Sequence, residues 1–394
     1  MRGHIVKRYS TRYKNSWTIT IEMGKDPATG KRKQQTVSVK GTKKQAEQRL
    51  EEMLHALDTG TFMRPGKTTL AAFLEKYIHD YARPNLSPRT TEGYESIFTQ
   101  HIIPKLGSIP IMQLRPEHIQ QYYSETMASG RSNGKGGLTA HTVRHHHMAL
   151  HRALEIAVKW GLLIRNPVDV IDPPRFQRVE MHVMNEDNIN HFLETARPTR
   201  YYPLFYLALF TGMRRSELLA LRWSDVDLYL CQISVNRTLH CLKDRSLVFR
   251  APKTAKGRRT VALSPSAAIM LRQHKEKQET DKLLAGSQIK ESDLVFTDIE
   301  GKPMLPDTIS RGWANLAVKA GLKGIRLHDA RHTHASIMLK QGVHPKIVQE
   351  RLGHASIQTT LDVYSHVAPG LQEKAAESFD SAVLAPHRQE TYSN

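Results

Sequence analysis

The sequence predicts a multidomain protein that is mainly α-helical and carries small β-sheets. The chain has 394 residues, which is enough for two or three domains that each bury a core. Apolar residues recur at helical spacing from residue 69 to about 163, and again from 264 to 364. Strand-like alternation is confined to two stretches, residues 16–39 and 227–263.

The composition is that of a strongly basic chain. Fifty-seven Lys and Arg against 38 Asp and Glu give a net charge of +19, which favours a nucleic-acid partner over a merely solvated surface. No apolar run reaches the length of a membrane span, and the N-terminus lacks the apolar segment of a signal peptide. Cys231 and Cys241 are too few for a disulfide framework or a four-thiolate metal site. We therefore expect a cytoplasmic, nucleoid-associated protein with no membrane partner.

The N-terminal segment predicts a small basic β-sheet backed by one helix over residues 1–60. Its first 44 residues hold twelve Lys or Arg and two acids. Residues 16–21 and 34–39 alternate as strands do, and turn-forming residues lie between them. Thr42 is the predicted N-cap of a helix that runs from residue 43 to about 57. This regular pattern argues against a disordered basic tail.

A helical domain is predicted over residues 66–167. Its last helix, from Thr139 to about Trp160, includes a cluster of histidines at positions 145, 146, 147 and 151. Two of them stand four residues apart, as zinc ligands on a helix can. However, Arg144 and Arg152 flank the cluster, and the acidic partner of a metalloprotease helix is missing. We favour a basic, DNA-facing helix over a metal site.

Residues 168–184 predict a linker to a last domain, residues 185–385. Strands expected at 227–242, 247–252 and 258–263 would form one small antiparallel sheet. The remaining elements are predicted helices at 264–284, 306–320, 330–341 and 345–352, followed by a helix that contains Tyr364. The last domain is therefore predicted to be of the α+β type.

Three ordered motifs in the last domain carry candidate catalytic side chains. These are Thr211-Gly212-Met213-Arg214, then His328 with Arg331, then Leu352-Gly353-His354 with Tyr364 ten residues on. Arginine and histidine side chains can carry the charge that builds on a phosphodiester, and a phenol can attack it. Each residue alone has an ordinary interpretation, such as a surface arginine or a core tyrosine. Their order and spacing together favour the catalytic interpretation.

This set of motifs resembles the tyrosine recombinase (phage integrase) family. The resemblance implies that Tyr364 is the nucleophile and forms a 3′-phosphotyrosyl bond. It implies that Arg214 and Arg331 bind the non-bridging phosphate oxygens, that His354 donates a hydrogen bond to one of them, and that His328 acts in proton transfer. Because one phosphoester is exchanged for another, no ATP, metal or other cofactor is expected.

In this family a lysine of the β-hairpin protonates the leaving 5′-oxygen. Lys253, in Pro252-Lys253-Thr254, matches that position best, and Lys256 is the competitor. Both remain candidates at this point.

The resemblance also assigns roles to the domains. Residues 1–60 would bind arm-type DNA sites, residues 66–167 would be the core-binding, SAM-like domain, and residues 185–385 would be the catalytic domain with a C-terminal tail. The tail would pack on a neighbouring protomer or on its own core. Expected partners are double-stranded DNA with core-type and arm-type sites, three further copies in a homotetramer, an excision factor and a host DNA-bending protein.

The implied function is that of an integrase that inserts and excises a mobile element or prophage. The alternatives are a chromosome or plasmid dimer resolvase, a type IB topoisomerase-like enzyme, and a catalytically inactive DNA-binding regulator. The basic N-terminal segment favours the integrase, because a two-domain resolvase would lack it.

Overall fold

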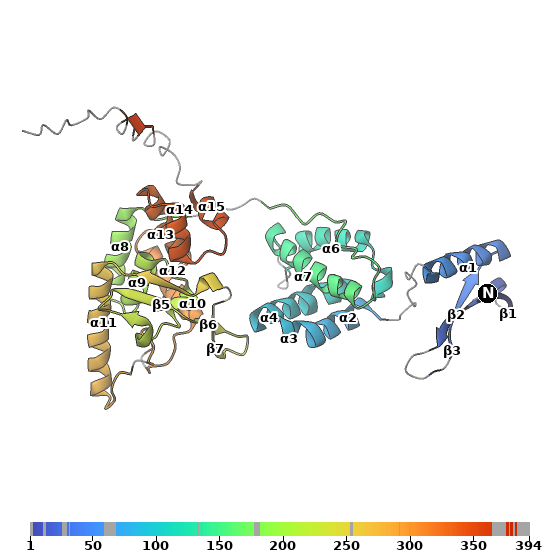
Figure 1. Ribbon diagram of the computed structural model, residues 1–394, viewed down its shortest axis with the longest axis horizontal. Coiled ribbons are helices and arrows are strands. Elements are labelled where there is room, and N and C mark those ends of the chain that lie inside the picture. The colour runs from blue at the N-terminus through green and yellow to red at the C-terminus, as the bar shows by residue number, and fades with distance from the viewer. Residues whose placement is uncertain are drawn as a thin grey trace, which may run out of the picture. The chain divides into compact units, whose positions relative to one another are not determined.

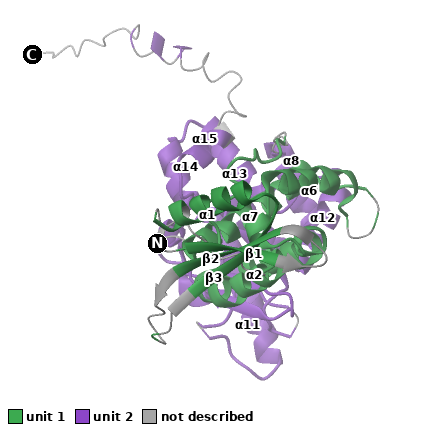
Figure 2. Ribbon diagram, turned by 90° about the vertical axis from the view of Figure 1, so that its right-hand side faces the viewer, with its two compact units in different colours: residues 1–177 green, residues 178–394 purple. Residues whose placement is uncertain are grey.

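The computed structural model describes residues 3–10, 13–25, 30, 32–58, 68–131, 134, 136–176, 182–252, 255–290, 292–298, 300–364, 376–377, 379–380 and 383 (Figure 1). The chain divides into two compact units, residues 1–177 and 178–394 (Figure 2). The division falls inside the stretch predicted as a linker. The predicted fold class is confirmed, because the described elements are mostly helices with small antiparallel sheets.

Unit 1 begins with an antiparallel sheet of β1 (Gly3–Ser10), β2 (Tyr13–Lys25) and β3 (Arg32–Lys40), in the order β1-β2-β3, on which α1 (Lys43–Asp58) packs (Figure 1). Buried Ile19, Ile21 and Met53 form its core. Thr42 caps α1 as predicted, because its Oγ1 accepts the backbone N–H of Gln45 at 3.3 Å. Strand β1 was missed, since it is defined by its pairing with β2 more than by its own alternation.

The rest of unit 1 is helical. Its elements are α2 (Leu70–Tyr77), the π-helical turn η1 (Ile78–Ala82), α3 (Arg83–Asn85), α4 (Pro88–Ile97), the π-helical turn η2 (Phe98–Ile102), α5 (Ile103–Leu106), the 3₁₀ turn η3 (Ile111–Gln113), α6 (Pro116–Ser129) and α7 (Ala140–Lys159). Ser87 and Thr139 cap α4 and α7 with their hydroxyl oxygens. The apolar stripe of α2 is buried in the core of this helical part.

Most of the histidine cluster on α7 faces other protein groups. His146 is 2% exposed and its Nδ1 lies 2.8 Å from the Tyr122 hydroxyl, while His147 Nδ1 lies 3.0 Å from the Tyr123 hydroxyl. Burial lowers the pKa of His146 to about 4. His146 therefore belongs to the core and not to a DNA-facing surface. In the part of the chain that the structure describes, no group of three or more His, Cys, Asp or Glu is placed to hold a metal ion.

Unit 2 packs helices around two small sheets. Its helices are α8 (Glu186–Ala196), α9 (Tyr202–Thr211), α10 (Arg215–Leu218), α11 (Pro265–Leu284), α12 (Pro306–Lys319), α13 (Asp329–Lys340), α14 (Pro345–Leu352) and α15 (Gln358–Tyr364), with 3₁₀ turns η4 (Trp223–Asp225) and η5 (Ala255–Gly257). Its strands are β4 (Val226–Asp227), β5 (Gln232–Val235), β6 (Thr238–Cys241), β7 (Leu247–Arg250) and β8 (Arg259–Ala262). Buried Trp313 lies at the centre of the core, with its ring 4.2 Å from that of Phe192.

The prediction of one continuous strand over residues 227–242 is wrong. The stretch forms parts of β4, β5 and β6, which belong to two sheets, β4-β5-β8 and β6-β7. The chain turns at Cys231, which has a φ of 50°. It breaks again at Asn236 and Arg237, because both side chains donate to the buried carboxylate of Asp225, at 3.0 and 2.9 Å.

Helices α13, α14 and α15 lie together at one end of unit 2 (Figure 1). Each packs against the other two, and β8 packs against α14. Among the helices in the described ranges, none is both long and apolar enough to cross a membrane.

Candidate active site

The C-terminal end of α14 holds three arginines from three other elements. Arg259 Nε donates to the carbonyl of residue 351 at 2.6 Å, Arg331 Nη2 to that of residue 352 at 2.5 Å, and Arg214 Nη2 to that of residue 353 at 3.0 Å. The last carbonyls of a helix have no partner within the helix and carry its negative end. Guanidinium groups are well suited to this position because they bring both donors and positive charge.

A buried carboxylate joins two of these arginines. Glu217, in the first turn of α10, is 2% exposed. Its oxygens accept Nη1 of Arg214 at 2.7 Å and both Nη atoms of Arg259, at 3.1 and 2.8 Å. Burial by itself would raise the pKa of Glu217, but the contacts with Arg259 and Arg214 outweigh it and hold the pKa below its usual value. Glu217 is therefore ionised and fixes the position of both guanidinium groups.

Sequence reasoning missed Glu217 and Arg259. A signal existed for Glu217, because it stands three residues after Arg214 at a helix start, where a side chain can return to the N-cap backbone. Its Oε2 indeed accepts the backbone N–H of Arg214 at 2.9 Å. Arg259 carries no local signal for its role, since its partners in the site, Glu217 and the carbonyl of residue 351, lie 42 and 92 residues away.

Arg331 is almost completely enclosed. It is 3% exposed, and its Nη1 donates to the carbonyl of Gly212 at 2.8 Å. Burial, together with the charge of Arg214, lowers the pKa of Arg331 to about 9. The guanidinium therefore stays protonated at neutral pH. Gly212 has a φ of +62°, and a Cβ there would lie 2.5 Å from the Leu352 side chain, so glycine is required at this position of the motif.

His354 follows the arginine-binding carbonyls directly. It is 7% exposed, and its Nδ1 lies 2.9 Å from Oγ1 of Thr360 on α15. The side chain of Gln349 donates to the carbonyl of His354 at 3.2 Å and holds the backbone. Burial and the charges of Arg331 and Arg214 lower the pKa of His354 to about 3, so the ring is neutral.

His328 lies at the edge of this group. It is exposed at the N-terminal end of α13, with its ring 4.9 Å from that of His332. His332 is in turn one of the charges that lower the pKa of His354. The structure thus brings Arg214, Arg331 and His354 together and leaves His328 beside them.

Two predicted residues are described incompletely or not at all. Tyr364 is the last residue of α15, and its side chain lies outside the described residues. Lys253 also lies outside them. The competing lysine, Lys256, is exposed, and its Nζ donates to the carbonyl of Ala355 at 3.1 Å, next to His354 in the chain.

A contact between an arginine and a histidine lies next to the site. Arg351 Nε donates to Nε2 of His334 at 3.0 Å, and Nδ1 of His334 lies 2.9 Å from the carbonyl of Leu209. This geometry requires a neutral ring with its proton on Nδ1. Burial and the neighbouring Arg351 lower the pKa of His334 to about 4, which agrees with that geometry. The contact ties α14 to α13 and to the end of α9.

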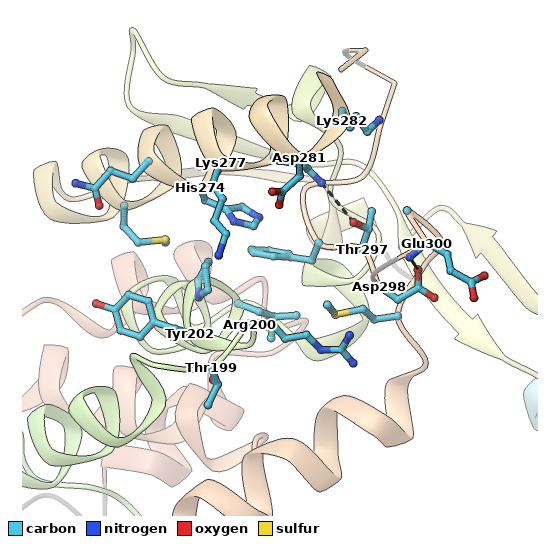
Figure 3. A pocket seen from close by; sticks show the side chains of 18 of the residues that line it. Thr199, Arg200, Tyr202, His274, Lys277, Asp281, Lys282, Thr297, Asp298 and Glu300 are labelled. Carbon is cyan, nitrogen blue, oxygen red and sulfur yellow. Dashed lines mark hydrogen bonds between the residues drawn. The ribbon is translucent and has the colours of Figure 1, made fainter. Parts of the chain in front are cut away.

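A cavity of about 690 Å³ lies elsewhere in unit 2, between the start of α9, α11 and residues 296–304 (Figure 3). Its lining mixes cations and acids, among them Arg200, Lys277, Lys282, Asp281, Asp298 and Glu300. Of the predicted catalytic residues whose side chains the structure describes, none lines this cavity, and Glu217 does not line it either. The arginine cluster at the end of α14, and not this cavity, is the candidate active site.

The fold and the site together define a DNA-breaking and DNA-rejoining enzyme of the tyrosine recombinase class. Residues 182–370 match the model of the phage integrase family, and residues 69–127 match the model of the N-terminal SAM-like domain of phage integrases. The chain belongs to the phage integrase family. It is a tyrosine-type site-specific recombinase.

Relatives of similar length support this assignment. A tyrosine recombinase XerC-like protein of Caldanaerobacter subterraneus is 27% identical over 389 residues, which cover 94% of this chain and 97% of the relative. The ICEBs1 integrase of Bacillus subtilis is also 27% identical, over 92% of this chain and 96% of that protein. Among solved structures, the Tn1549 transposon integrase in complex with transposon right end DNA matches with a TM-score of 0.66 and 21% identity, covering 78% of this chain and 99% of that one. This last likeness shows a shared fold.

Proposed function

We propose that the protein is the integrase of a mobile element or prophage, and that Tyr364 attacks the scissile phosphodiester of double-stranded DNA. The attack forms a 3′-phosphotyrosyl bond and releases a 5′-hydroxyl, which later attacks the phosphotyrosine to rejoin a strand. The observation that carries this proposal is the convergence of Arg214, Arg331 and His354 at the end of α14, against which the tyrosine helix packs.

Arg214 and Arg331 are the proposed phosphate ligands. Each guanidinium has more N–H donors than its contacts with carbonyls and Glu217 use. Three guanidinium groups meet at this helix end, and Glu217 pairs with two of them, Arg214 and Arg259. Positive charge is therefore in excess where negative charge would build on phosphorus. Because carbonyls and a carboxylate already hold the arginines, little reorganisation is needed when the phosphate binds.

His354 is the proposed donor to a non-bridging oxygen, and His328 the proposed proton-transfer group for the phenol. His354 lies in the arginine cluster, which suits contact with the same phosphate. His328 is exposed and therefore accessible to the attacking group. For the leaving 5′-oxygen, Lys253 is the proposed general acid. Lys256, which is held at the carbonyl of Ala355, is the alternative.

The proposal extends to the domains and partners. Residues 1–60 are proposed to bind arm-type sites, residues 66–167 to bind core sites, and residues 185–385 to carry out catalysis. Solved relatives include lambda integrase as a tetramer bound to a Holliday junction, with a TM-score of 0.54 and 18% identity. By analogy we propose a homotetramer on paired sites. An excision factor and a host DNA-bending protein are the proposed accessory partners.

A suicide-substrate assay tests the proposed chemistry. A nicked duplex built from the element–chromosome junction beside the gene loses a short 5′-hydroxyl fragment after cleavage, so a covalent adduct accumulates. The wild-type protein should form a denaturant-resistant adduct, and Tyr364→Phe should form none while it still binds the duplex. An adduct with Tyr364→Phe, or none with the wild type, would refute the assignment of the nucleophile.

A second assay separates the rival functions. Paired junction duplexes should give four-way junctions and recombinant products. Relaxation of supercoiled plasmid without such sites would indicate a topoisomerase-like enzyme. Duplex binding without any cleavage would indicate an inactive regulator. Reaction only between two identical chromosomal or plasmid sites would indicate a dimer resolvase.

A further inference from the structure

A buried hydroxyl group lies against the candidate active site. Thr360, in α15, is 0% exposed, and its Oγ1 lies 2.9 Å from Nδ1 of His354. Within the described part of the chain, this ring nitrogen is the only hydrogen-bond partner of the hydroxyl. The preceding residue, Thr359, has the same side chain and is exposed. The two threonines therefore occupy different environments on one helix.

The direction of the hydrogen bond follows from the chemistry of the substrate. Phosphate oxygens only accept hydrogen bonds, so a neutral imidazole can contact them only through an N–H group. Since Nδ1 faces Thr360, the phosphate must be met by Nε2, and Nε2 must carry the ring proton. Nδ1 is then an acceptor, and the Thr360 hydroxyl must be its donor.

We propose that Thr360 is a positioning residue whose hydroxyl donates to Nδ1 of His354 and thereby holds the ring in the tautomer that presents Nε2–H to the scissile phosphate. This inference rests on the proposed role of His354 as a phosphate ligand. Without the hydroxyl, a neutral ring would also populate the Nδ1–H tautomer, which offers the phosphate a lone pair.

The place of Thr360 in the chain gives this contact a second consequence. Thr360 stands four residues before Tyr364, one turn earlier on the same short helix. The hydroxyl of Thr360, which sets the tautomer, and the proposed nucleophile Tyr364 therefore belong to the same helix, α15. His354 is set for phosphate binding only when the tyrosine helix is docked.

The direct test is the tautomer of His354, which does not depend on activity. Long-range ¹H–¹⁵N spectra of the full-length protein with ¹⁵N-labelled histidine, assigned with His354→Gln, should show a protonated Nε2 and an unprotonated Nδ1. Thr360→Val keeps the size of the side chain and removes the hydroxyl, so it should move His354 toward a mixture of tautomers. Thr360→Ser should retain the wild-type signature. An unchanged tautomer in Thr360→Val, or a protonated Nδ1 in the wild type, would overturn the inference.

Single-turnover cleavage supplies the functional arm. Thr360→Val should slow adduct formation on the suicide duplex on the order of 10²-fold, as expected for a weakened donor to the transition state. Thr360→Ser should keep most of the rate, and Thr359→Val, on the exposed side of the same helix, should match the wild type.

Thermal unfolding separates positioning from folding. If Thr360→Val and Thr360→Ser lose rate equally and in proportion to a fall in Tm, the hydroxyl has a structural role only, and the inference is wrong. If the wild-type protein forms no adduct, the proposed function fails, and the tautomer spectra still decide the role of Thr360.

Discussion

The guanidinium of Arg214 donates to the carbonyl of Gly353 at 3.0 Å, across 139 residues of sequence. The contact joins the first arginine motif to the Leu-Gly-His motif, and it exists because Gly353 adopts a left-handed conformation, with a φ of +67°, at the C-terminal end of α14. That turn directs successive carbonyls toward three arginines. One glycine conformation thus determines where positive charge gathers in unit 2.

Substitution of this glycine should be more damaging than its φ alone implies. A Cβ at Gly353 would lie 2.9 Å from the carbonyl oxygen of Lys256 and 3.0 Å from Cδ of Arg259. Gly321 has a similar φ of +71° and open space where a Cβ would lie, so Gly321→Ala is the matched control. We expect a loss of about 1–2 kcal/mol in unfolding free energy for Gly321→Ala. For Gly353→Ala we expect roughly 1–3 kcal/mol more. Equal losses in urea titrations would contradict this account.

Removal of the charge of Glu217 should unsettle the arginine pair. Glu217→Gln keeps the size of the side chain but leaves Arg259, whose side chain is 6% exposed, without its counter-ion. Breaking a buried pair typically costs about 3–5 kcal/mol, and we expect a loss of that order together with slower DNA cleavage. The control is Glu300→Gln, which removes an exposed ion pair with Lys302 and should change stability by less than about 1 kcal/mol. Similar effects of the two substitutions in chemical denaturation would disprove the proposed role of Glu217.

Stability should fall as the pH is lowered from 7 to 5. The pKa of His334 is about 4 in the folded protein against an ordinary value of 6.5, so the unfolded chain binds more protons in this range and acid favours unfolding. Each such histidine should remove about 2 kcal/mol between these pH values. His334→Gln, whose amide can both donate and accept, should flatten the dependence by a similar amount. The unfolding free energies of the wild type and of His334→Gln should be measured at both pH values. If both proteins lose the same free energy between pH 7 and 5, the assignment is wrong.

The two candidate lysines should respond differently to a change of leaving group. Lys253→Ala should slow cleavage by about 10²–10⁴-fold, as for loss of a general acid. A substrate with a 5′-bridging sulfur should restore the rate, because a thiolate leaves without a proton. Lys256→Ala should have the smaller effect on the rate, and the sulfur substrate should not correct it, since Lys256 is tied to the carbonyl of Ala355. If the sulfur substrate restores the cleavage rate of Lys256→Ala and not that of Lys253→Ala, then Lys256 is the general acid and Lys253 is not.

Much of the local structure could be predicted from the chain. Thr42 was predicted as the N-cap of α1, and Ser264 stands at the predicted start of the helix that it caps, because a side-chain oxygen that satisfies a free N–H acts within three residues. Motif spacing likewise selected Arg214, Arg331 and His354, which the fold brings together. Helix starts and motif spacing depend on residues that are close in sequence, and so they can be predicted from a single sequence.

The tertiary structure alone decided which groups meet across the chain. Nothing in the spacing of residues pairs Glu217 with Arg259, or turns His146 toward Tyr122 and into the core. The strand predicted over residues 227–242 was broken for the same reason, since buried Asp225 takes Asn236 and Arg237 as partners. A buried charge or polar group needs a partner, but the identity of that partner is settled by packing between distant segments. The sequence by itself determined the chemical groups and the helices that carry them, and the fold determined how those groups hold one another.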